Sequence, residues 1–321
     1  MKIKTALILS ILFGASVARA DNVILMIGDG MGANHLKCAA MDKPLYIPAL
    51  PVKGLVTTKS ADKEVTDSAA SATAYACGQK TNNKFLGKLP NGNNCLTIAE
   101  EAVQKGLAVG IYSTDHKTGA TPSAFYAHTT SRHDAETILA DKKRAATQMD
   151  IVVPVEKIAA EVTPRLQKLS RNEKGFFVLF EGAKIDTKSH VNDLDGMKRE
   201  LYDFDRAVIR AVNFAYHHPD TTVIVLADHE TGGLTDSCSY TTKNHTAQNI
   251  PVHAYGKHAK LFNGIQDNTE IYKKIRRILL TTDQTKPAKK PLTPPNPAQK
   301  EFDGKRGHSA GRGKAPSGAV K

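Results

Sequence analysis

The chain has 321 residues, and 40% of them are apolar, which is an ordinary share for a globular protein and enough for one large hydrophobic core. The formal net charge of +12 is unevenly distributed, because the first 20 residues carry a net three positive charges and residues 283–321 a net six. The central part, residues 21–282, is therefore close to neutral, which argues against a nucleic-acid-binding fold.

The first 20 residues have the pattern of a secretory signal peptide. Lys2 and Lys4 precede an apolar run over 6–17, and Ala18 and Ala20 are the small residues expected before a cleavage site. The apolar run is shorter than the roughly 20 residues that a membrane-spanning helix needs. We therefore expect an exported protein, periplasmic or secreted, that is cleaved after Ala20 and has no transmembrane segment in its mature chain.

The central part alternates predicted strands and helices in chain order. Short, continuous apolar runs predict buried strands at 22–29, 107–113, 176–180, 221–227 and 250–255. Helical spacing of apolar residues predicts helices at 96–105, 155–169, 194–216 and 270–280. The alternation predicts an α/β fold, a three-layer sandwich whose central, mostly parallel sheet is covered by helices on both faces.

Residues 283–321 are rich in proline, glycine and lysine and poor in apolar residues, which predicts a disordered basic tail. The predicted regions are thus a signal peptide at 1–20, one folded domain at 21–282 and the tail at 283–321. The chain has four cysteines, at positions 38, 77, 95 and 238. In an oxidising compartment the four cysteines allow three disulfide pairings, and the sequence does not choose between them. The alternative is that some of the cysteines are buried free thiols. No CxxC pair is present, which argues against a cysteine-type zinc site.

Three of the predicted strands deliver an acidic residue at or next to their carboxyl ends: Asp29, Glu181 and Asp228. Because ligands bind beyond the carboxyl ends of the strands in such sheets, we expect these side chains to lie together. Further candidate ligands follow the same strands: Asp186, His190, His229 and His245. Any one of these residues alone would more readily be an ordinary surface acid or core histidine. The set is different, because all of them follow strands that end at the same edge of the sheet. Carboxylates crowded there would repel each other unless a positive charge lay between them. Mixed Asp and His sets suit zinc, and carboxylate with hydroxyl oxygens suits magnesium.

The segment 65–74 (VTDSAASATA) predicts a helix that begins near Ser68 and continues to Ala76. A serine at this position is commonly a capping residue. The amide hydrogens and the positive dipole at a helix N-terminus can also hold a phosphoryl group. The small side chains that follow Ser68 allow a ligand to approach the backbone closely.

Together these segments resemble the alkaline phosphatase family. The stretch VTDSAASATA (65–74) is similar to the active-site signature of that family, and ATPSAFYAHTTSR (120–132) to its phosphate-arginine segment. Four further stretches resemble its metal-binding segments: NVILMIGDGMG (22–32), FEGAKIDTKSH (180–190), ADHETGG (227–233) and HTAQNIPVHAYG (245–256). The six stretches occur in the order of the family. The resemblance implies an alkaline-phosphatase-like catalytic domain at 21–282 that hydrolyses small-molecule phosphate monoesters through a phosphoserine, releasing inorganic phosphate and an alcohol.

The resemblance also implies a role for individual residues. Ser68 would be the nucleophile, and Arg132 would bind two phosphate oxygens. Two zinc ions and one magnesium ion would be held by three sets of ligands, namely Asp29, Asp228 and His229, then Asp186, His190 and His245, and finally Asp29, Thr121 and Glu181. These roles suit the residue types, because a serine hydroxyl needs activation and a planar guanidinium matches phosphate oxygens.

The sequence departs from the family pattern at several points. Gly119 stands where relatives usually have Asp or His, and Thr187 where they have Lys, His or Trp; both positions bear on the magnesium site or the phosphate. The segments 133–175 and 233–245 are shorter than usual, which predicts a compact, bacterial-type member and leaves a homodimer open.

Two other functions are compatible with parts of the pattern. A sulfatase would need a Cys/Ser-x-Pro-x-Arg motif, which the stretch after Ser68 lacks, and related diesterases usually have threonine and no arginine clamp. A non-catalytic, exported metal- or phosphate-binding protein is the third reading. The intact set of nucleophile and ligands favours the phosphomonoesterase. The physiological ester is not decided by the sequence.

Overall fold

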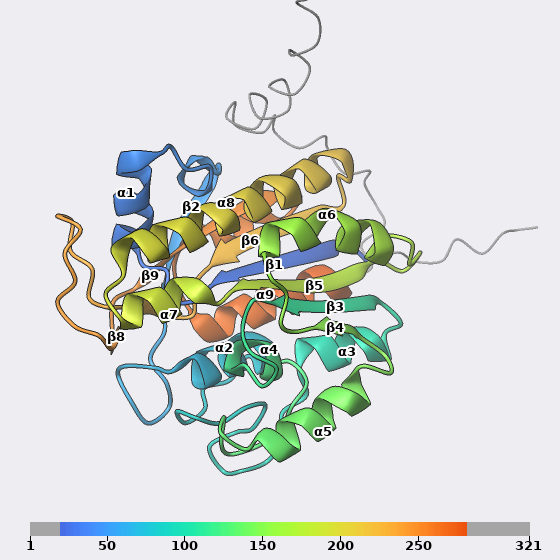
Figure 1. Cartoon of the computed structure of the whole chain (residues 1–321). Coiled ribbons are helices and arrows are strands. Elements are labelled where there is room, and N and C mark those ends of the chain that lie inside the picture. Colours follow the sequence, from blue (N-terminus) through green and yellow to red (C-terminus); the bar gives the residue numbers. More distant parts are fainter. Residues whose placement is uncertain (1–19, 281–321) are drawn as a thin grey trace, which may run out of the picture.

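The computed structural model describes residues 20–280 of the chain (Figure 1). The predicted basic tail, and the predicted signal peptide except Ala20, lie outside the described residues. None of the helices between residues 20 and 280 combines the length and the hydrophobicity that a bilayer crossing requires.

An eight-stranded sheet forms the centre of the structure, in the order β10-β2-β9-β6-β1-β5-β3-β4. The strands are β1 (Asn22–Gly28), β2 (Val52–Thr57), β3 (Ala108–Ser113), β4 (Asp150–Val152), β5 (Phe176–Gly182), β6 (Thr221–Leu226), β9 (Ile250–Gly256) and β10 (Gly264–Asp267). β9 is antiparallel to β2 and β6, and the other neighbouring pairs in this sheet are parallel. The predicted mostly parallel α/β sheet is therefore confirmed.

The three central strands end at the same level, which places the residues that follow them side by side. β1 pairs with β5 so that Gly28 lies opposite Gly182, and with β6 so that Ile27 lies opposite Leu226. All three strands are buried along their whole length, as their unbroken apolar sequences predict.

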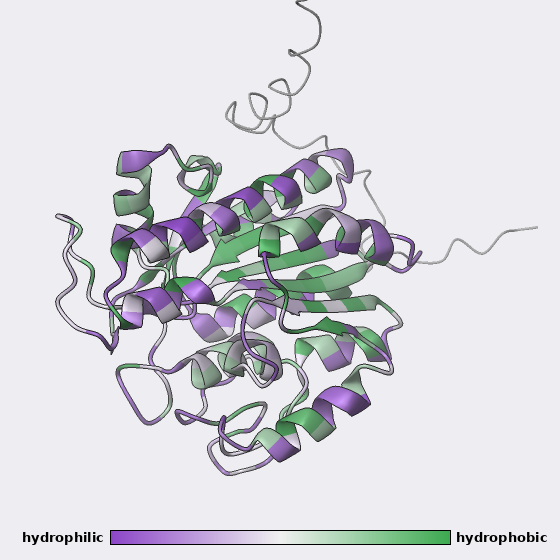
Figure 2. Ribbon diagram, viewed as in Figure 1, coloured by the Kyte–Doolittle hydropathy of each residue, from purple (hydrophilic) through white to green (hydrophobic). Residues whose placement is uncertain are grey.

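Helices cover both faces of the sheet. α6 (Ile158–Leu169) and α8 (Leu194–His217) pack together on one face, and α3 (Ile98–Gln104) and α9 (Asn268–Leu280) lie on the other (Figure 1). The remaining α-helices are α1 (Ala33–Asp42), α2 (Ser68–Cys77), α4 (Ala120–Ser123), α5 (Ala135–Ala145) and α7 (Lys184–His190). Figure 2 shows the apolar sheet enclosed between helices whose outer sides are polar, which is the pattern of amphipathic helices over a buried sheet.

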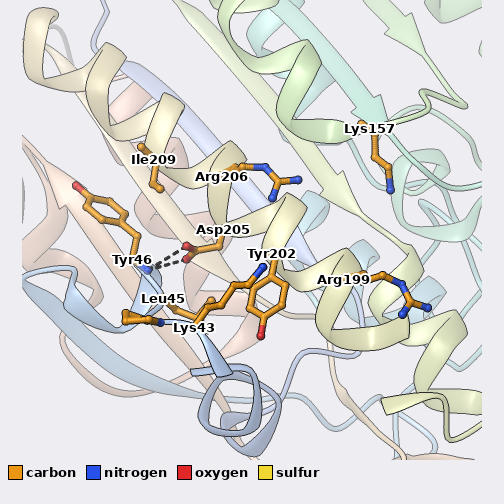
Figure 3. A pocket seen from close by; sticks show the side chains of 10 residues that line it. Lys43, Leu45, Tyr46, Lys157, Arg199, Tyr202, Asp205, Arg206 and Ile209 are labelled. Carbon is orange, nitrogen blue, oxygen red and sulfur yellow. Dashed lines mark hydrogen bonds between the residues drawn. The ribbon is translucent and has the colours of Figure 1, made fainter. Parts of the chain in front are cut away.

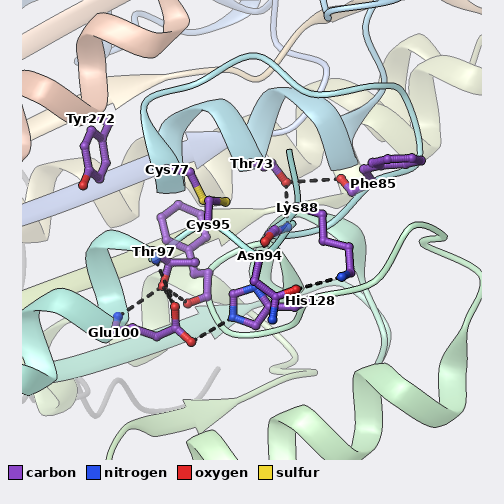
Figure 4. Close-up of a disulfide and its surroundings, with 12 residues drawn as sticks. Thr73, Cys77, Phe85, Lys88, Asn94, Cys95, Thr97, Glu100, His128 and Tyr272 are labelled. Carbon is purple, nitrogen blue, oxygen red and sulfur yellow. Dashed lines mark hydrogen bonds and ion pairs between the residues drawn. A yellow bond between two sulfur atoms is a disulfide. The ribbon is translucent and has the colours of Figure 1, made fainter. Parts of the chain in front are cut away.

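The structure pairs all four cysteines. One disulfide joins Cys38 of α1 to Cys238 in the segment before β8 (His245–Thr246), which pairs with β7 (Glu230–Thr231) in a small separate sheet. The other joins Cys77, the last residue of α2, to Cys95 just before α3 (Figure 4). The structure thus selects one of the three pairings that the sequence left open.

Candidate active site

The predicted site residues gather at the carboxyl ends of β1, β5 and β6. Asp29 directly follows β1, and its backbone N–H donates to the carbonyl of Gly182 at 3.2 Å, which fixes the end of β1 against β5. Glu181 is the last residue but one of β5, and Asp228 follows β6 by two residues. Glu181 and Asp228 are fully buried and Asp29 is 5% exposed, so all three carboxylates lie out of bulk water.

Asp29, Asp228 and His229 form the first cluster of potential metal ligands. One ligand atom from each lies within 4.8 Å of the others. The Nε2 atom of His229 is 3.2 Å from Oδ2 of Asp228 and 3.6 Å from Oδ1 of Asp29. Gly30 N–H and His229 N–H both donate to Oδ1 of Asp228, at 3.1 and 3.0 Å, so the other oxygen of that carboxylate faces the cluster.

Asp186, His190 and His245 form the second cluster. Nε2 of His190 lies 3.3 Å from Oδ2 of Asp186 and 3.1 Å from Nε2 of His245. Nε2 of His245 is 3.6 Å from Oδ1 of Asp186. The rings of His245 and His229 are stacked with their centroids 3.5 Å apart, so the two clusters adjoin each other.

Backbone carbonyls orient two of these histidines. Nδ1 of His190 lies 2.6 Å from the carbonyl oxygen of Lys243, and Nδ1 of His245 lies 3.0 Å from that of Thr66. Because a carbonyl only accepts, each Nδ1 carries a proton, and each ring turns its Nε2 toward the cluster. This is the arrangement by which outer groups commonly orient metal-ligating histidines.

Ser68 is the first residue of α2, as its small-residue sequence predicts. Its hydroxyl oxygen lies 3.2 Å from Nε2 of His229, and the residue is only 3% exposed. Asp67 caps the helix by accepting the backbone N–H of Ala70 at 3.0 Å. The N-terminus of α2, with its amide hydrogens and positive dipole end, therefore points at the metal-ligand clusters.

Two hydroxyl groups fasten α2 to the strand end that carries Asp228. Ser71 donates to the carbonyl of Asp228 at 2.8 Å, and Tyr75 donates to the carbonyl of Ala227 at 2.7 Å. These hydrogen bonds fix the height of the helix relative to the sheet, and with it the position of the Ser68 hydroxyl.

Arg132 reaches the same region from the segment between α4 and α5. Its Nη1 donates to Oδ2 of Asp67 at 3.3 Å, and its backbone N–H donates to the carbonyl of Lys84 at 2.8 Å. Its side chain is 27% exposed, so part of the guanidinium is open to solvent and to a ligand. Asp67 was not among the predicted site residues. Its position directly before Ser68, at the start of the predicted helix, could have marked it as a capping residue next to the nucleophile.

A third group consists of oxygen ligands alone. Thr121 of α4 is fully buried, like Glu181, and the hydroxyl of Ser113 donates to Oε2 of Glu181. Four buried oxygens at this end of the sheet have no hydrogen-bond partner: Asp29 Oδ1, Thr121 Oγ1, Glu181 Oε1 and Asp228 Oδ2. Buried polar atoms without partners are uncommon and costly, and a cation is a partner that carboxylate and hydroxyl oxygens of this kind can bind.

The electrostatics of the site point in the same direction. Burial is the largest cause that raises the pKa of Asp29 well above its ordinary value, and the charge of Asp228 is the second largest. Burial and then the charge of Asp186 raise the pKa of Asp228 to about 6. Burial, and next the charge of Asp115, raises the pKa of Glu181. Carboxylates crowded in this way are stabilised as anions only by a nearby positive charge.

Asp186 is the exception among these acids. Burial alone would raise its pKa, but the hydrogen bond with His190 and the charges of His229 and His245 outweigh burial and lower it. Thr187, where the sequence departs from the family pattern, is exposed on α7. Asp115 was not among the predicted site residues. It comes two residues after β3, so the search for acids just beyond the carboxyl ends of strands, which found Asp29, could also have found Asp115.

A large surface cavity lies outside this site. It has a volume of about 710 Å³ and is lined by residues of α8 and of the segment after α1, with Lys157 (Figure 3). Asp205 accepts the backbone N–H groups of Tyr46 and Ile47 beneath it, at 2.9 to 3.0 Å. None of the predicted site residues lines the cavity, so its size does not mark the chemical centre.

Fold and site together define a class: a three-layer α/β protein in which a buried serine at a helix N-terminus adjoins two clusters of metal ligands. The family model described as alkaline phosphatase matches residues 20–163 and 155–242. The chain belongs to the alkaline phosphatase family.

Individual relatives agree with this assignment. The chain is 30% identical to alkaline phosphatase 4 of Bacillus subtilis over 290 residues, 68% of this chain and 63% of that protein. It is 28% identical to the alkaline phosphatase of Escherichia coli, covering 79% of this chain and 84% of the relative. The solved alkaline phosphatase of the Antarctic bacterium TAB5 superposes with a TM-score of 0.73 at 28% identity, covering 81% of this chain and 98% of that one. The match thus spans about three fifths of the Bacillus relative, and the alignment with the Escherichia coli protein extends over 398 positions, more than the 321 residues of this chain.

Proposed function

We propose that this protein hydrolyses phosphate monoesters through a phosphoserine formed on Ser68. One observation carries the proposal: the Ser68 hydroxyl lies at the N-terminus of α2, 3.2 Å from a histidine of one metal-ligand cluster and next to the other. Membership of the alkaline phosphatase family supports the substrate class. The products are an alcohol and inorganic phosphate, as for small-molecule monoesters generally.

The donor sets fit the metals that the family resemblance implies. Each of the two clusters combines carboxylate with imidazole, which suits zinc, and the group of Asp29, Thr121 and Glu181 offers oxygen only, which suits magnesium. The four unpartnered buried oxygens support this fit, because a cation is the partner that they lack. A variant of the TAB5 enzyme has been solved with Mg bound in its M3 site, which supports magnesium as a third metal. When bound, the metals act as Lewis acids that favour the deprotonated serine and water and neutralise charge on the phosphate.

The protein groups position the reacting atoms. The hydroxyl oxygen of Ser68 forms a bond to phosphorus while the bond between phosphorus and the ester oxygen breaks, and that oxygen takes up a proton and leaves as the alcohol. Water then attacks the phosphoserine, the bond from phosphorus to the serine oxygen breaks, and the hydroxyl regains its proton. Arg132 binds two equatorial phosphate oxygens in both steps, with its guanidinium held in place by Asp67.

We also propose that the protein works outside the cytoplasm, in the periplasm or secreted. The signal-peptide pattern of residues 1–20 supports export, and the two disulfides fit an oxidising compartment. The division into domains, and a homodimer, stay predictions from the sequence.

The direct test is Ser68→Ala, with Ser170→Ala at the far end of α6 as the matched control. Ser68→Ala should lower the turnover of p-nitrophenyl phosphate by about a thousandfold or more, because the nucleophile is removed. Elemental analysis should find the same zinc and magnesium content in both variants. Mass spectrometry of acid-quenched wild-type protein should find phosphate on Ser68. Near-normal turnover of the Ser68→Ala variant would exclude the covalent route, and preference for bis-p-nitrophenyl phosphate would indicate a diesterase instead.

A further inference from the structure

Gly119 departs from the family pattern next to the oxygen-only group, and the structure shows what occupies its place. A Cβ atom added to Gly119 would lie 2.1 Å from Oδ2 and 2.4 Å from Cγ of Asp115. The backbone does not require glycine at this position, because its φ of −52° and ψ of 140° are open to any residue. The Asp115 side chain, whose Cβ atom would also lie only 2.7 Å away, therefore fills the space that a side chain at position 119 would need.

Asp115 is connected to the oxygen-only group through one hydroxyl. Its backbone N–H donates to the Ser113 hydroxyl at 2.8 Å, and that hydroxyl donates in turn to Oε2 of Glu181. Its Oδ1 accepts the backbone N–H of His116 at 2.7 Å, which holds the side chain over the turn that leads to Gly119. The Asp115 side chain is 21% exposed, so it lies at the mouth of the site and not in the core.

The charge of Asp115 acts on the ligands of that group. After burial, it is the largest cause of the raised pKa of Glu181, and it also contributes to the raised pKa of Asp29. Asp115 belongs to neither of the two clusters of potential metal ligands. The nearby unpartnered oxygens of Glu181 and Thr121, both fully buried, mark where a cation would sit.

We propose that Asp115 supplies the outer carboxylate of the magnesium site and replaces, from a different position in the chain, the side chain that Gly119 lacks. Asp115 is then a positioning residue, which binds the waters of a hydrated Mg²⁺ held by Asp29, Thr121 and Glu181. An oxygen group at this place suits Mg²⁺, which keeps several of its waters, whereas an imidazole would suit zinc. The inference rests on the proposed function, because it concerns the third metal of the same site.

Metal binding tests the inference without any assay of turnover. Mg²⁺ is titrated by calorimetry into zinc-loaded wild-type protein, Asp115→Asn, and Glu173→Gln as a control at the opposite edge of the sheet, just before β5. Asparagine still accepts the His116 N–H, so a purely structural role would be retained and only the charge is lost. Asp115→Asn should weaken Mg²⁺ binding about 10- to 100-fold, as loss of an outer-shell partner typically does, while Glu173→Gln leaves it unchanged.

A second pair of variants tests the exchange of positions. Gly119→Asp alone should lower the melting temperature, because the new side chain collides with Asp115. The double variant Asp115→Gly with Gly119→Asp removes every clashing atom, including the Asp115 Cβ, and should recover both the melting temperature and most of the Mg²⁺ affinity, because one carboxylate again occupies the shared space. Wild-type Mg²⁺ affinity in Asp115→Asn, or no Mg²⁺ binding by the wild type, would overturn the inference. Mg²⁺ binding that depends on Asp115 in a protein without phosphatase activity would instead refute the proposed function alone.

Discussion

Three hydrogen bonds to the Asp67 carboxylate allow the stability loss of an Asp67 variant to be predicted. Its carboxylate accepts the N–H of Ala70 at 3.0 Å as the cap of α2, the N–H of Lys84 at 3.0 Å, and Nη1 of Arg132 at 3.3 Å. A lost cap costs about 1 kcal/mol and a lost backbone hydrogen bond about 1 kcal/mol. The ion pair with the partly exposed Arg132 adds at most about 0.5 kcal/mol, since solvent screens it.

Asp67→Ala should therefore lower the free energy of unfolding by about 2 to 2.5 kcal/mol. Asp67→Asn should lower it by only about 1 kcal/mol, because asparagine caps a helix as well as aspartate does. Urea unfolding at fixed zinc and magnesium concentrations measures both, with Asp236→Asn on an exposed loop as the control. Two results would contradict these roles of Asp67: an alanine variant whose free energy of unfolding stays within about 0.5 kcal/mol of the wild type, or an asparagine variant that loses as much stability as the alanine variant.

Two further predictions concern metals and pH. Chelation should abolish phosphatase activity and lower the melting temperature, and added Zn²⁺ with Mg²⁺ should restore both; full activity in the chelator would contradict the metal assignment. The second concerns Glu100 and His128, whose side chains lie 2.9 Å apart near the Cys77–Cys95 disulfide (Figure 4). Burial lowers the pKa of His128, but hydrogen bonds to Glu100 and to the Gly87 carbonyl outweigh it and raise that pKa above 6.5. Burial raises the pKa of Glu100, but His128 and the hydrogen bonds from Thr97 lower it below 4.5 overall. The stability that His128 contributes is fully present below its unfolded pKa and is lost as pH rises through its raised folded pKa. The stability that Glu100 contributes is present above its unfolded pKa and is lost as pH falls through its lowered folded pKa. Glu100→Gln, which keeps the capping box with Thr97, should thus destabilise the protein at pH 5.5 and much less at pH 9, and an equal loss at both values by urea unfolding would contradict the pairing.

The longer alignment with the Escherichia coli relative means that segments of that protein have no counterpart here. All ten predicted site residues nevertheless lie within the part of the chain that the structure describes, around the end of the central sheet. The departure at Gly119 coincides with the Asp115 side chain in the space that a side chain at position 119 would need.

Several elements were not predicted because their sequences carry weak local signals. β2 (VKGLVT) is half-exposed and contains Lys53 and Gly54, and β4 has only three residues. β10 lies at the edge of the sheet with Ile265 exposed. Pairing with a neighbouring strand, not apolar patterning, makes these segments strands. The predicted helix at 155–169 begins at Ile158, because the preceding Lys157 is in an extended conformation with φ −135° and ψ 122°.

Local patterns were enough to predict the central strands, the long helices and a set of candidate site residues, because unbroken apolar runs, helical spacing and acids at strand ends can each be recognised within one segment. The folded chain was needed to find the distances between Ser68, His229 and His245, the pairing of Cys38 with Cys238, and the place of Asp115 over Gly119. Each of these depends on the register of strands and on contacts between residues far apart in the chain. Such contacts are set by the packing of the whole sheet against its helices and leave no pattern in any one segment.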